Sequence, residues 1–152
     1  MIVTFCGHRE LHDAAEVERW LISCVETLLQ NGATEFLLGG YGGFDRLAAS
    51  VLHAMRQAYP AILSTLVLPY PDQKRDLSLY DGSVYPPLES VPRKYAIIHR
   101  NRWMVRQADA LVAYVRYGWG GAAQTLDYAR TKKKIVFLYP DVLPCHRAGS
   151  LL

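Results

Sequence analysis

The chain has 152 residues, of which 51% are hydrophobic and 20% are charged. This size and composition exclude a disordered chain and predict one soluble globular domain over residues 1–152, whose core needs no disulfide or metal. The formal net charge is +3 and most basic residues are scattered, which argues against a nucleic-acid-binding protein and is compatible with a small anionic ligand.

The first half of the chain predicts two strand-helix units and a third strand. Residues 2–5 form a short apolar, β-branched run that is typical of a strand. The next segment has an amphipathic helical pattern with apolar residues at Ala14, Val17, Leu21, Val25, Leu28 and Leu29. An Asn-Gly pair ends this helix. Residues 35–38 are expected to form a strand, 44–59 a helix, and 62–68 a strand that ends before a proline.

The second half begins with a long segment that lacks a regular pattern. Residues 69–92 contain many of the prolines and predict a long loop, which in a compact domain is typical of a lid or a binding loop. A helix is expected over residues 93–108, with an apolar stripe through Ile97, Met104, Val105 and Ala108. The remaining expected elements are a strand at 110–115, a helix at 122–132, a strand at 135–138 and a C-terminal tail at 141–152.

The order of these elements predicts the fold class. Strands and helices alternate, which is typical of α/β proteins with a parallel sheet. The runs Leu-Val-Ala-Tyr-Val and Ile-Val-Phe-Leu are continuously apolar, as expected for strands that are covered on both faces. We therefore predict a three-layer, Rossmann-like α/β fold with a mostly parallel sheet and helices on both faces.

Cysteine usage and the start of the sequence bear on the cellular compartment. The chain has 3 cysteines, an odd number, and it opens on a strand-like run without a signal-peptide pattern. Its apolar runs are too short to span a membrane. We expect a reduced, cytoplasmic protein without a membrane partner.

Glycine-rich loops follow three of the predicted strands. They are Cys6-Gly7-His8-Arg9, Gly39-Gly40-Tyr41-Gly42-Gly43 and Gly118-Trp119-Gly120-Gly121. Because the carboxyl ends of parallel strands share one edge of a sheet, we expect these loops to form one ligand crevice. Glycine permits close backbone approach, and the amides that begin the following helix favour a phosphate or another anion.

Known motifs of nucleotide enzymes are absent from these loops. Neither double-glycine loop has the dinucleotide-binding fingerprint with its acidic residue, and neither ends in Gly-Lys-Ser/Thr. The chain also lacks a Gly-x-Ser-x-Gly nucleophile motif. These absences disfavour an ordinary NAD-dependent dehydrogenase, a P-loop ATPase and a serine hydrolase of that type.

Asp45 is the candidate catalytic residue. It lies in the first turn of the helix after the second loop, where it either caps backbone amides or contacts a ligand. Because a carboxylate repels phosphate, a ligand contact by Asp45 would involve ribose hydroxyls or acid-base chemistry at a sugar carbon. Arg9 and Arg46 flank the loops and either remain exposed to solvent or pair with phosphate.

Asn101 lies on the expected apolar stripe of its helix. A polar side chain there needs a partner, which is either a backbone group or a ligand. Cys6, His8 and His12 lie close in sequence, but their spacing does not match a zinc site. We expect neither a metal nor a cofactor.

The loops together resemble a known family. The segments Phe-Cys-Gly-His-Arg at 5–9, Gly-Gly-Tyr-Gly-Gly-Phe-Asp-Arg-Leu-Ala at 39–48 and Arg-Asn-Arg-Trp-Met-Val at 100–105 are similar to the YpsA-like family. That family belongs to the SLOG superfamily, which is named for DNA-processing protein A (Smf) and the LONELY GUY phosphoribohydrolases. The resemblance runs from residue 2 to about residue 139.

This resemblance implies a Rossmann-like domain that binds nucleotides or nucleotide-derived small molecules, and a homodimer. The implied nucleotide-binding residues are Gly7, His8, Arg9, Gly39, Gly40, Gly42, Gly43, Asp45, Arg46, Asn101, Arg102, Gly118, Gly120, Gly121 and Thr125.

The activity implied by the resemblance depends on the third loop. The phosphoribohydrolase relatives have a Pro-Gly-Gly-x-Gly-Thr loop followed by a catalytic Glu. The counterpart here, Trp-Gly-Gly-Ala-Ala-Gln-Thr-Leu at 119–126, lacks the proline, the third glycine and the Glu, and only Asp127 lies near that place. Our first hypothesis is therefore binding or sensing of a nucleotide-like molecule. The alternatives are nucleotide N-glycoside hydrolysis and single-stranded nucleic-acid binding, and the latter would need a basic groove.

Overall fold

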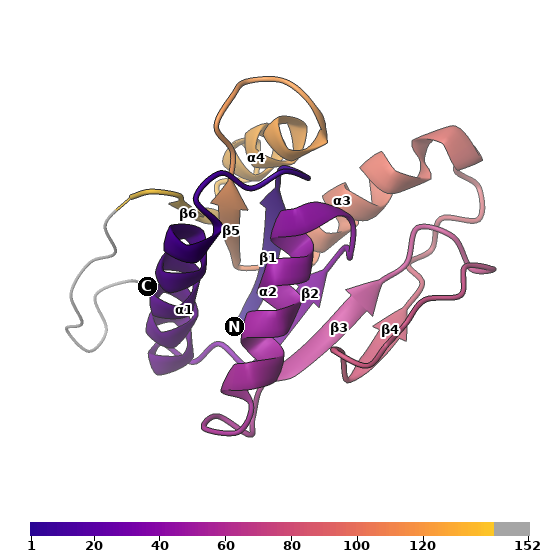
Figure 1. Ribbon diagram of the computed structural model, residues 1–152. Helices are drawn as coiled ribbons and strands as arrows, with labels where there is room; N and C mark the ends of the chain where they lie inside the picture. Colours follow the sequence, from indigo (N-terminus) through magenta and orange to yellow (C-terminus); the bar gives the residue numbers. More distant parts are fainter. Residues whose placement is uncertain (142–152) are drawn as a thin grey trace.

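The computed structural model describes residues 1–141 and contains a six-stranded, all-parallel sheet in the order β4-β3-β2-β1-β5-β6 (Figure 1). The strands are β1 (Ile2–Gly7), β2 (Glu35–Leu38), β3 (Leu63–Val67), β4 (Gly82–Val84), β5 (Ala110–Tyr114) and β6 (Ile135–Leu138). The helices are α1 (Ala14–Gln30), α2 (Gly42–Met55), the short 3-10 helix η1 (Arg93–Tyr95), α3 (Ala96–Gln107) and α4 (Gly121–Thr131).

Helices cover both faces of this sheet. On one face, Val3 and Phe5 of β1 belong to the same buried cluster as residues of α1 and α2. On the other face, Cys6 packs with Val105 of α3 and Leu126 of α4. Successive side chains of a strand point to opposite faces, so β1 contributes to both clusters. The predicted three-layer α/β fold is confirmed, with α1 and α2 on the face nearer to the viewer in Figure 1.

The strand order places a topological switch point beside β1. From β1 the chain adds β2, β3 and β4 on one side, and then returns through α3 to place β5 on the other side. The loops after β1 and β5 therefore leave neighbouring strands in opposite directions. This is the place where open parallel sheets bind ligands, outside the carboxyl ends of the strands.

Several element boundaries differ from the sequence-based expectation by a few residues, most of all at the end of α2. The helix expected over 44–59 begins two residues earlier and ends at Met55, because the chain forms a turn in which Tyr59 donates its N–H to Met55. Pro60 follows this turn and disfavours a helical conformation at Tyr59. The strand expected over 62–68 is shorter by one residue at each end.

The segment 69–92, expected to have no regular element, contains the short edge strand β4. Its Gly-Ser-Val sequence has no strand pattern, and the strand forms because it pairs with β3. Asp81, which directly precedes β4, positions this strand beside β3, since its carboxylate accepts the Ser64 N–H at 2.7 Å and forms an ion pair with Arg56. The rest of the segment is irregular.

Among residues 1–141, none of the helices is long and apolar enough to cross a membrane. Of the tail expected at 141–152, only Asp141 belongs to the described residues.

The carboxyl end of β1 predicts a sharp packing constraint. A Cβ atom added to Gly7 would lie 2.4 Å from the Phe44 ring, whereas a Cβ at Gly82 would meet no atom within 4 Å. We expect Gly7→Ala to lower the free energy of unfolding by about 1–3 kcal/mol, because the Phe44 ring is fully buried and has to move. Gly82→Ala, the matched control, should change it by less than about 0.5 kcal/mol. Urea unfolding measures both, and equal stability of the two variants would contradict the packing account.

Candidate functional site

A cavity of about 860 Å³ lies at the carboxyl ends of β1 and β5. Its walls come from the loop after β1, the start of α2, one face of α3, and the loop that leads from β5 into α4. In Figure 1 this last loop arches above the ends of the two strands. The predicted site residues that line this main cavity are Gly7, His8, Arg9, Asp45, Asn101, Gly120, Gly121 and Thr125.

A second cavity of about 450 Å³ adjoins the first and shares Arg9 and Tyr41 with it. The predicted site residues Gly40, Gly42, Gly43 and Arg46 line this second cavity. The three glycine-rich loops occupy one edge of the sheet, as expected, and the second loop faces mainly the smaller of the two adjoining cavities. Gly39, Arg102 and Gly118 line neither cavity.

The glycines that begin α2 serve contacts within the protein. The Gly43 N–H donates to the Arg9 carbonyl at 2.8 Å, and a Cβ at Gly43 would lie 2.5 Å from that oxygen. Gly42 has a φ of +84°, and a Cβ there would lie 2.9 Å from the Arg9 Cα. The Phe44 N–H donates to the His8 carbonyl at 3.4 Å. The expected free amides at this helix end are therefore already paired with the loop after β1.

The buried Arg100 holds the ends of two strands together. Its Nη1 donates to the carbonyl of Gly39 at 2.9 Å and to the carbonyl of Val67 at 2.7 Å, which follow or end β2 and β3. Gly39 leaves room for this side chain, because a Cβ there would lie 3.0 Å from the guanidinium and 3.2 Å from Asp45. The Arg100 Nε donates to Asn101 Oδ1 at 2.8 Å. Asn101 thus has a protein partner and also lines the main cavity.

The expected apolar stripe of α3 is confirmed at Met104, Val105 and Ala108, which are buried, and is wrong at Ile97. Ile97 is 38% exposed, whereas Ala96, Arg100 and Met104 form the buried row at helical spacing. Because arginine is usually exposed, the sequence alone predicts a surface position for Arg100. For this reason the sequence analysis identified neither the buried row nor Arg100 as part of the site. Arg102 instead lies on the outer face, where its guanidinium sits over the Tyr128 ring at 5.4 Å.

Asp45 takes the capping role considered for it and is also placed at the main cavity. Its carboxylate accepts the Tyr41 N–H at 3.2 Å, which helps to cap α2, and the same carboxylate lines the main cavity. Burial raises the pKa of Asp45 to about 6, against the opposing effects of the Arg100 guanidinium, the N–H groups of Tyr41 and Gly40, and Arg75. A carboxyl group that titrates near neutral pH is suited to proton transfer.

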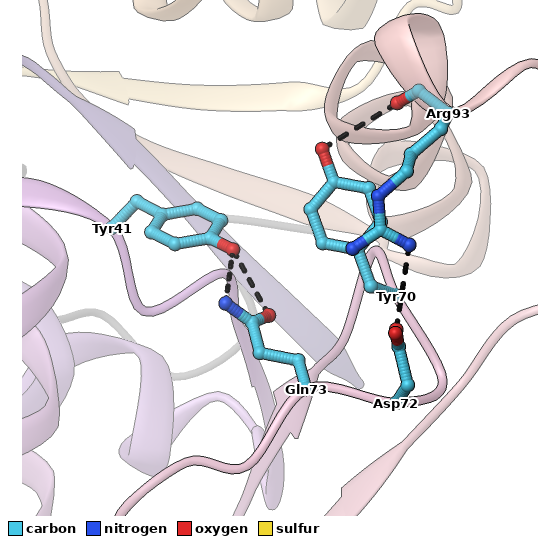
Figure 2. A network of polar contacts seen from close by, with 5 residues as sticks. All are labelled: Tyr41, Tyr70, Asp72, Gln73 and Arg93. Atoms are coloured by element: carbon cyan, nitrogen blue, oxygen red, sulfur yellow. Dashed lines mark hydrogen bonds and ion pairs between the residues drawn. The ribbon is translucent and has the colours of Figure 1, made fainter.

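Segment 69–92 is attached to the start of α2 through Tyr41. The Gln73 amide donates to the Tyr41 hydroxyl at 2.8 Å (Figure 2). Arg75 donates to the Gly40 carbonyl, and its guanidinium lies 4.9 Å from the centre of the Tyr41 ring. Gln73 and Arg75 line the second cavity. No sequence motif marks these two residues as part of the site.

A second group of contacts joins the start of the same segment to η1. The Arg93 guanidinium lies 4.2 Å from the centre of the Tyr70 ring and pairs with Asp72 at 3.4 Å. Figure 2 shows these contacts together with the Tyr41–Gln73 pair. The irregular segment is therefore anchored beside the smaller cavity by side chains at several points.

His8 is buried at the base of the β5–α4 loop. Its Nε2 accepts the Arg116 N–H at 2.9 Å, and its ring stacks on Tyr117 with a centroid separation of 3.8 Å. Burial lowers the pKa of His8, which favours the neutral ring that this acceptor bond requires. Within residues 1–141, no three His, Cys, Asp or Glu side chains gather as a group that could hold a metal ion. Burial also raises the pKa of the Cys6 thiol well above its usual range.

The start of α4 differs from that of α2. The N–H groups of Gly121, Ala122 and Ala123 donate to no other group of residues 1–141, and the first bond of this helix runs from the Gln124 N–H to the Gly120 carbonyl. A Cβ at Gly118, Gly120 or Gly121 would meet no atom within 4 Å. The Thr125 hydroxyl is used internally, since it donates to the Gly121 carbonyl at 2.8 Å. This helix end combines open space with unpaired amides at the main cavity.

Solved structures with a similar fold include the following three. The protein TM1055 matches with a TM-score of 0.59 and 19% identity, over 89% of this chain and 71% of its own. DNA processing protein A from Helicobacter pylori, described in its single-stranded DNA binding mode, matches with a TM-score of 0.64 and 19% identity, over 94% and 66% of the two chains. DNA processing protein A from Streptococcus pneumoniae matches with a TM-score of 0.60 and 20% identity, over 93% of this chain and 50% of its own.

The chain shares its fold with these three proteins. At these identities the similarity establishes the fold alone, and this chain spans between half and about seven tenths of the lengths of the three proteins. No protein-family model and no curated protein sequence matches the chain. The narrower resemblance to the YpsA-like family stays a prediction.

The raised pKa of Asp45 predicts a pH-dependent stability. An unfolded aspartate has a pKa of about 3.9, so between that value and about 6 the folded protein binds more protons than the unfolded chain. Wild type therefore loses on the order of 1–3 kcal/mol from this group as the pH rises through that window. Asparagine does not titrate, so Asp45→Asn should stabilise the protein more at about pH 7.5 than at about pH 4.5. Urea unfolding at both pH values measures this, and an equal or smaller gain at the higher pH would contradict the assignment.

Proposed function

We propose that the main cavity binds a nucleotide or nucleotide-derived small molecule, with its phosphate at the start of α4. The observation that carries this proposal is the set of unpaired amides at Gly121, Ala122 and Ala123 beside open space. Backbone N–H groups and the positive end of a helix form a ready-made site for phosphate. The start of α2 has fewer free amides for a phosphate, because the N–H groups of Gly43 and Phe44 already donate to carbonyls of the protein.

The charges around the main cavity fit a phosphate at one part and a sugar at another. Arg9 and Arg116 line the cavity and supply cationic groups for an anionic ligand. Asp45, which α2 supplies, would repel phosphate and instead suits ribose hydroxyls. In this arrangement the protein acts as a binder or sensor. The homodimer is part of the proposal on the resemblance alone, and the buried free thiols of Cys6 and Cys24 fit a reducing compartment such as the cytoplasm.

A second candidate function is nucleotide N-glycoside hydrolysis. Asp45 favours it, because its pKa of about 6 and its position in the cavity suit an acid or base. The departures of the 119–126 loop from the phosphoribohydrolase pattern weigh against it. Binding therefore remains the first proposal.

Single-stranded nucleic-acid binding is a third candidate. The similarity to the Helicobacter pylori DNA processing protein A favours it, and so the low net charge is not enough to set nucleic acid aside. The arginine-lined second cavity adds cationic surface beside the main one. Gel-shift titration with a short single-stranded oligonucleotide measures this activity directly.

Two glycines of one loop provide a matched test of the phosphate site. Both Gly121 and Gly118 are exposed with open space around them, but only Gly121 lines the main cavity. We expect Gly121→Leu to weaken binding of AMP and ribose 5-phosphate by about tenfold or more, because the side chain covers the amides. Gly118→Leu should leave both affinities unchanged. Isothermal titration calorimetry gives the affinities, and equal behaviour of the two variants would argue against a phosphate at this helix end.

Asp45→Asn distinguishes the binder from the hydrolase. For a binder, the variant should lose about 1–3 kcal/mol of affinity for AMP or ADP-ribose, and neither protein should release free base. For a hydrolase, wild type should release base catalytically, and the variant should be slower by about a hundredfold or more with little change in affinity. Chromatography of the products, run beside calorimetry, separates the two. Catalytic base release that the variant abolishes would overturn our proposal of a binder.

A further inference from the structure

Three aromatic rings form a continuous stack at the main cavity. The His8 and Tyr117 rings are 3.8 Å apart at an interplanar angle of 6°, and the Tyr117 and Trp119 rings are 4.2 Å apart at 29°. All three residues line the cavity. Exposure rises along the stack, from 7% for His8 through 42% for Tyr117 to 70% for Trp119.

The outer end of the stack is unusually open. Trp119 has the largest exposed fraction of the exposed large hydrophobic residues in the part of the chain that the structure describes. Its ring is stacked against Tyr117, but no aromatic ring among residues 1–141 is paired with it on a further side. A tryptophan held in this way presents a large apolar π surface to solvent, which is typical of a recognition site.

The inner end of the stack is fixed in place. His8 Nε2 accepts the Arg116 N–H at 2.9 Å, and the His8 ring also meets the Tyr114 ring edge-on at a centroid separation of 5.9 Å. Tyr114 itself is fully buried at the end of β5. The stack therefore extends from the core of the sheet to solvent. Because its rings are already held in place, a ligand that stacks on the outer ring costs the protein little conformational entropy.

We propose that Trp119 is the base-stacking subsite of the main cavity and takes the nucleobase of the bound mononucleotide. This inference rests on the proposed function, since it uses the phosphate site at the start of α4. Trp119 is followed directly by Gly120 and Gly121, and its Cα lies within about 7 Å of the Gly121 Cα along the chain. One nucleotide can therefore reach both places, with its phosphate on the amides and its base on the indole.

The kind of contact determines the expected selectivity. Every nucleobase has a π face, so stacking on an indole distinguishes nucleotides from sugar phosphates without choosing strongly among bases. Ribose 5-phosphate carries the phosphate and the sugar but no base. Comparing it with AMP and UMP isolates the contribution of Trp119 from that of the helix end.

The test compares Trp119→Leu with Tyr95→Leu, a control at an exposed aromatic residue that does not line the main cavity. Calorimetry with AMP, UMP and ribose 5-phosphate is run on wild type and both variants. We expect Trp119→Leu to weaken AMP and UMP binding by about fivefold to a hundredfold and to leave ribose 5-phosphate binding unchanged. Tyr95→Leu should change none of the affinities. In wild type, AMP should also quench tryptophan fluorescence, and this quenching should be lost in Trp119→Leu.

The outcomes separate the failure of this inference from that of the proposed function. If AMP binds and Trp119→Leu leaves its affinity unchanged, or weakens AMP and ribose 5-phosphate equally, the base-stacking assignment is wrong while the cavity remains a nucleotide site. If wild type binds none of the three compounds, both the proposed function and this inference are overturned. Dependence on Trp119 that is seen with a single-stranded oligonucleotide and not with AMP would also overturn the assignment to a mononucleotide.

Discussion

The buried guanidinium of Arg100 ties together the parts of the molecule from which the site is built. Removing a charged group from water is costly unless it is paired, and here two strand-end carbonyls and the Asn101 side chain accept its N–H groups. Burial lowers the pKa of Arg100 while the Asp45 carboxylate opposes this effect. Because β2 and β3 end at this one side chain, the edge of the sheet, the start of α2 and the face of α3 have a fixed relation to one another.

The two double-glycine loops look alike in sequence but differ in what their glycines do. In the loop before α2, the missing side chains make room for Arg100, Leu66 and the backbone of Arg9, so the glycines serve packing. In the loop before α4, the missing side chains leave space that nothing within the described part of the chain fills. Close packing explains the first set completely. In the second set, the φ of +91° at Gly120 itself favours glycine, whereas no neighbouring atom requires a glycine at Gly121. We propose that a ligand at the cavity does.

The sequence predicted the fold well because most elements have a strong local pattern. The strands at 35–38 and 135–138 are short apolar runs between turn residues, and their bounds match the structure. The strand β4 has no such pattern and exists through pairing with β3, which no local reading reveals. The site was predicted less completely, for two reasons. A sequence predicts that an arginine such as Arg100 is exposed, although this one is buried. A sequence also cannot distinguish a glycine that makes room for a ligand from one that, like Gly43, makes room for a neighbouring carbonyl.

The central claim is that the ligand phosphate lies at the start of α4 in the main cavity. The most direct measurement is a crystal structure of the protein grown with AMP. Our account predicts phosphate oxygens within hydrogen-bond distance of the Gly121 and Ala122 amides, about 2.7–3.2 Å. A phosphate bound instead among Arg9, Arg46 and Arg75 of the second cavity, with the α4 amides unoccupied, would contradict it.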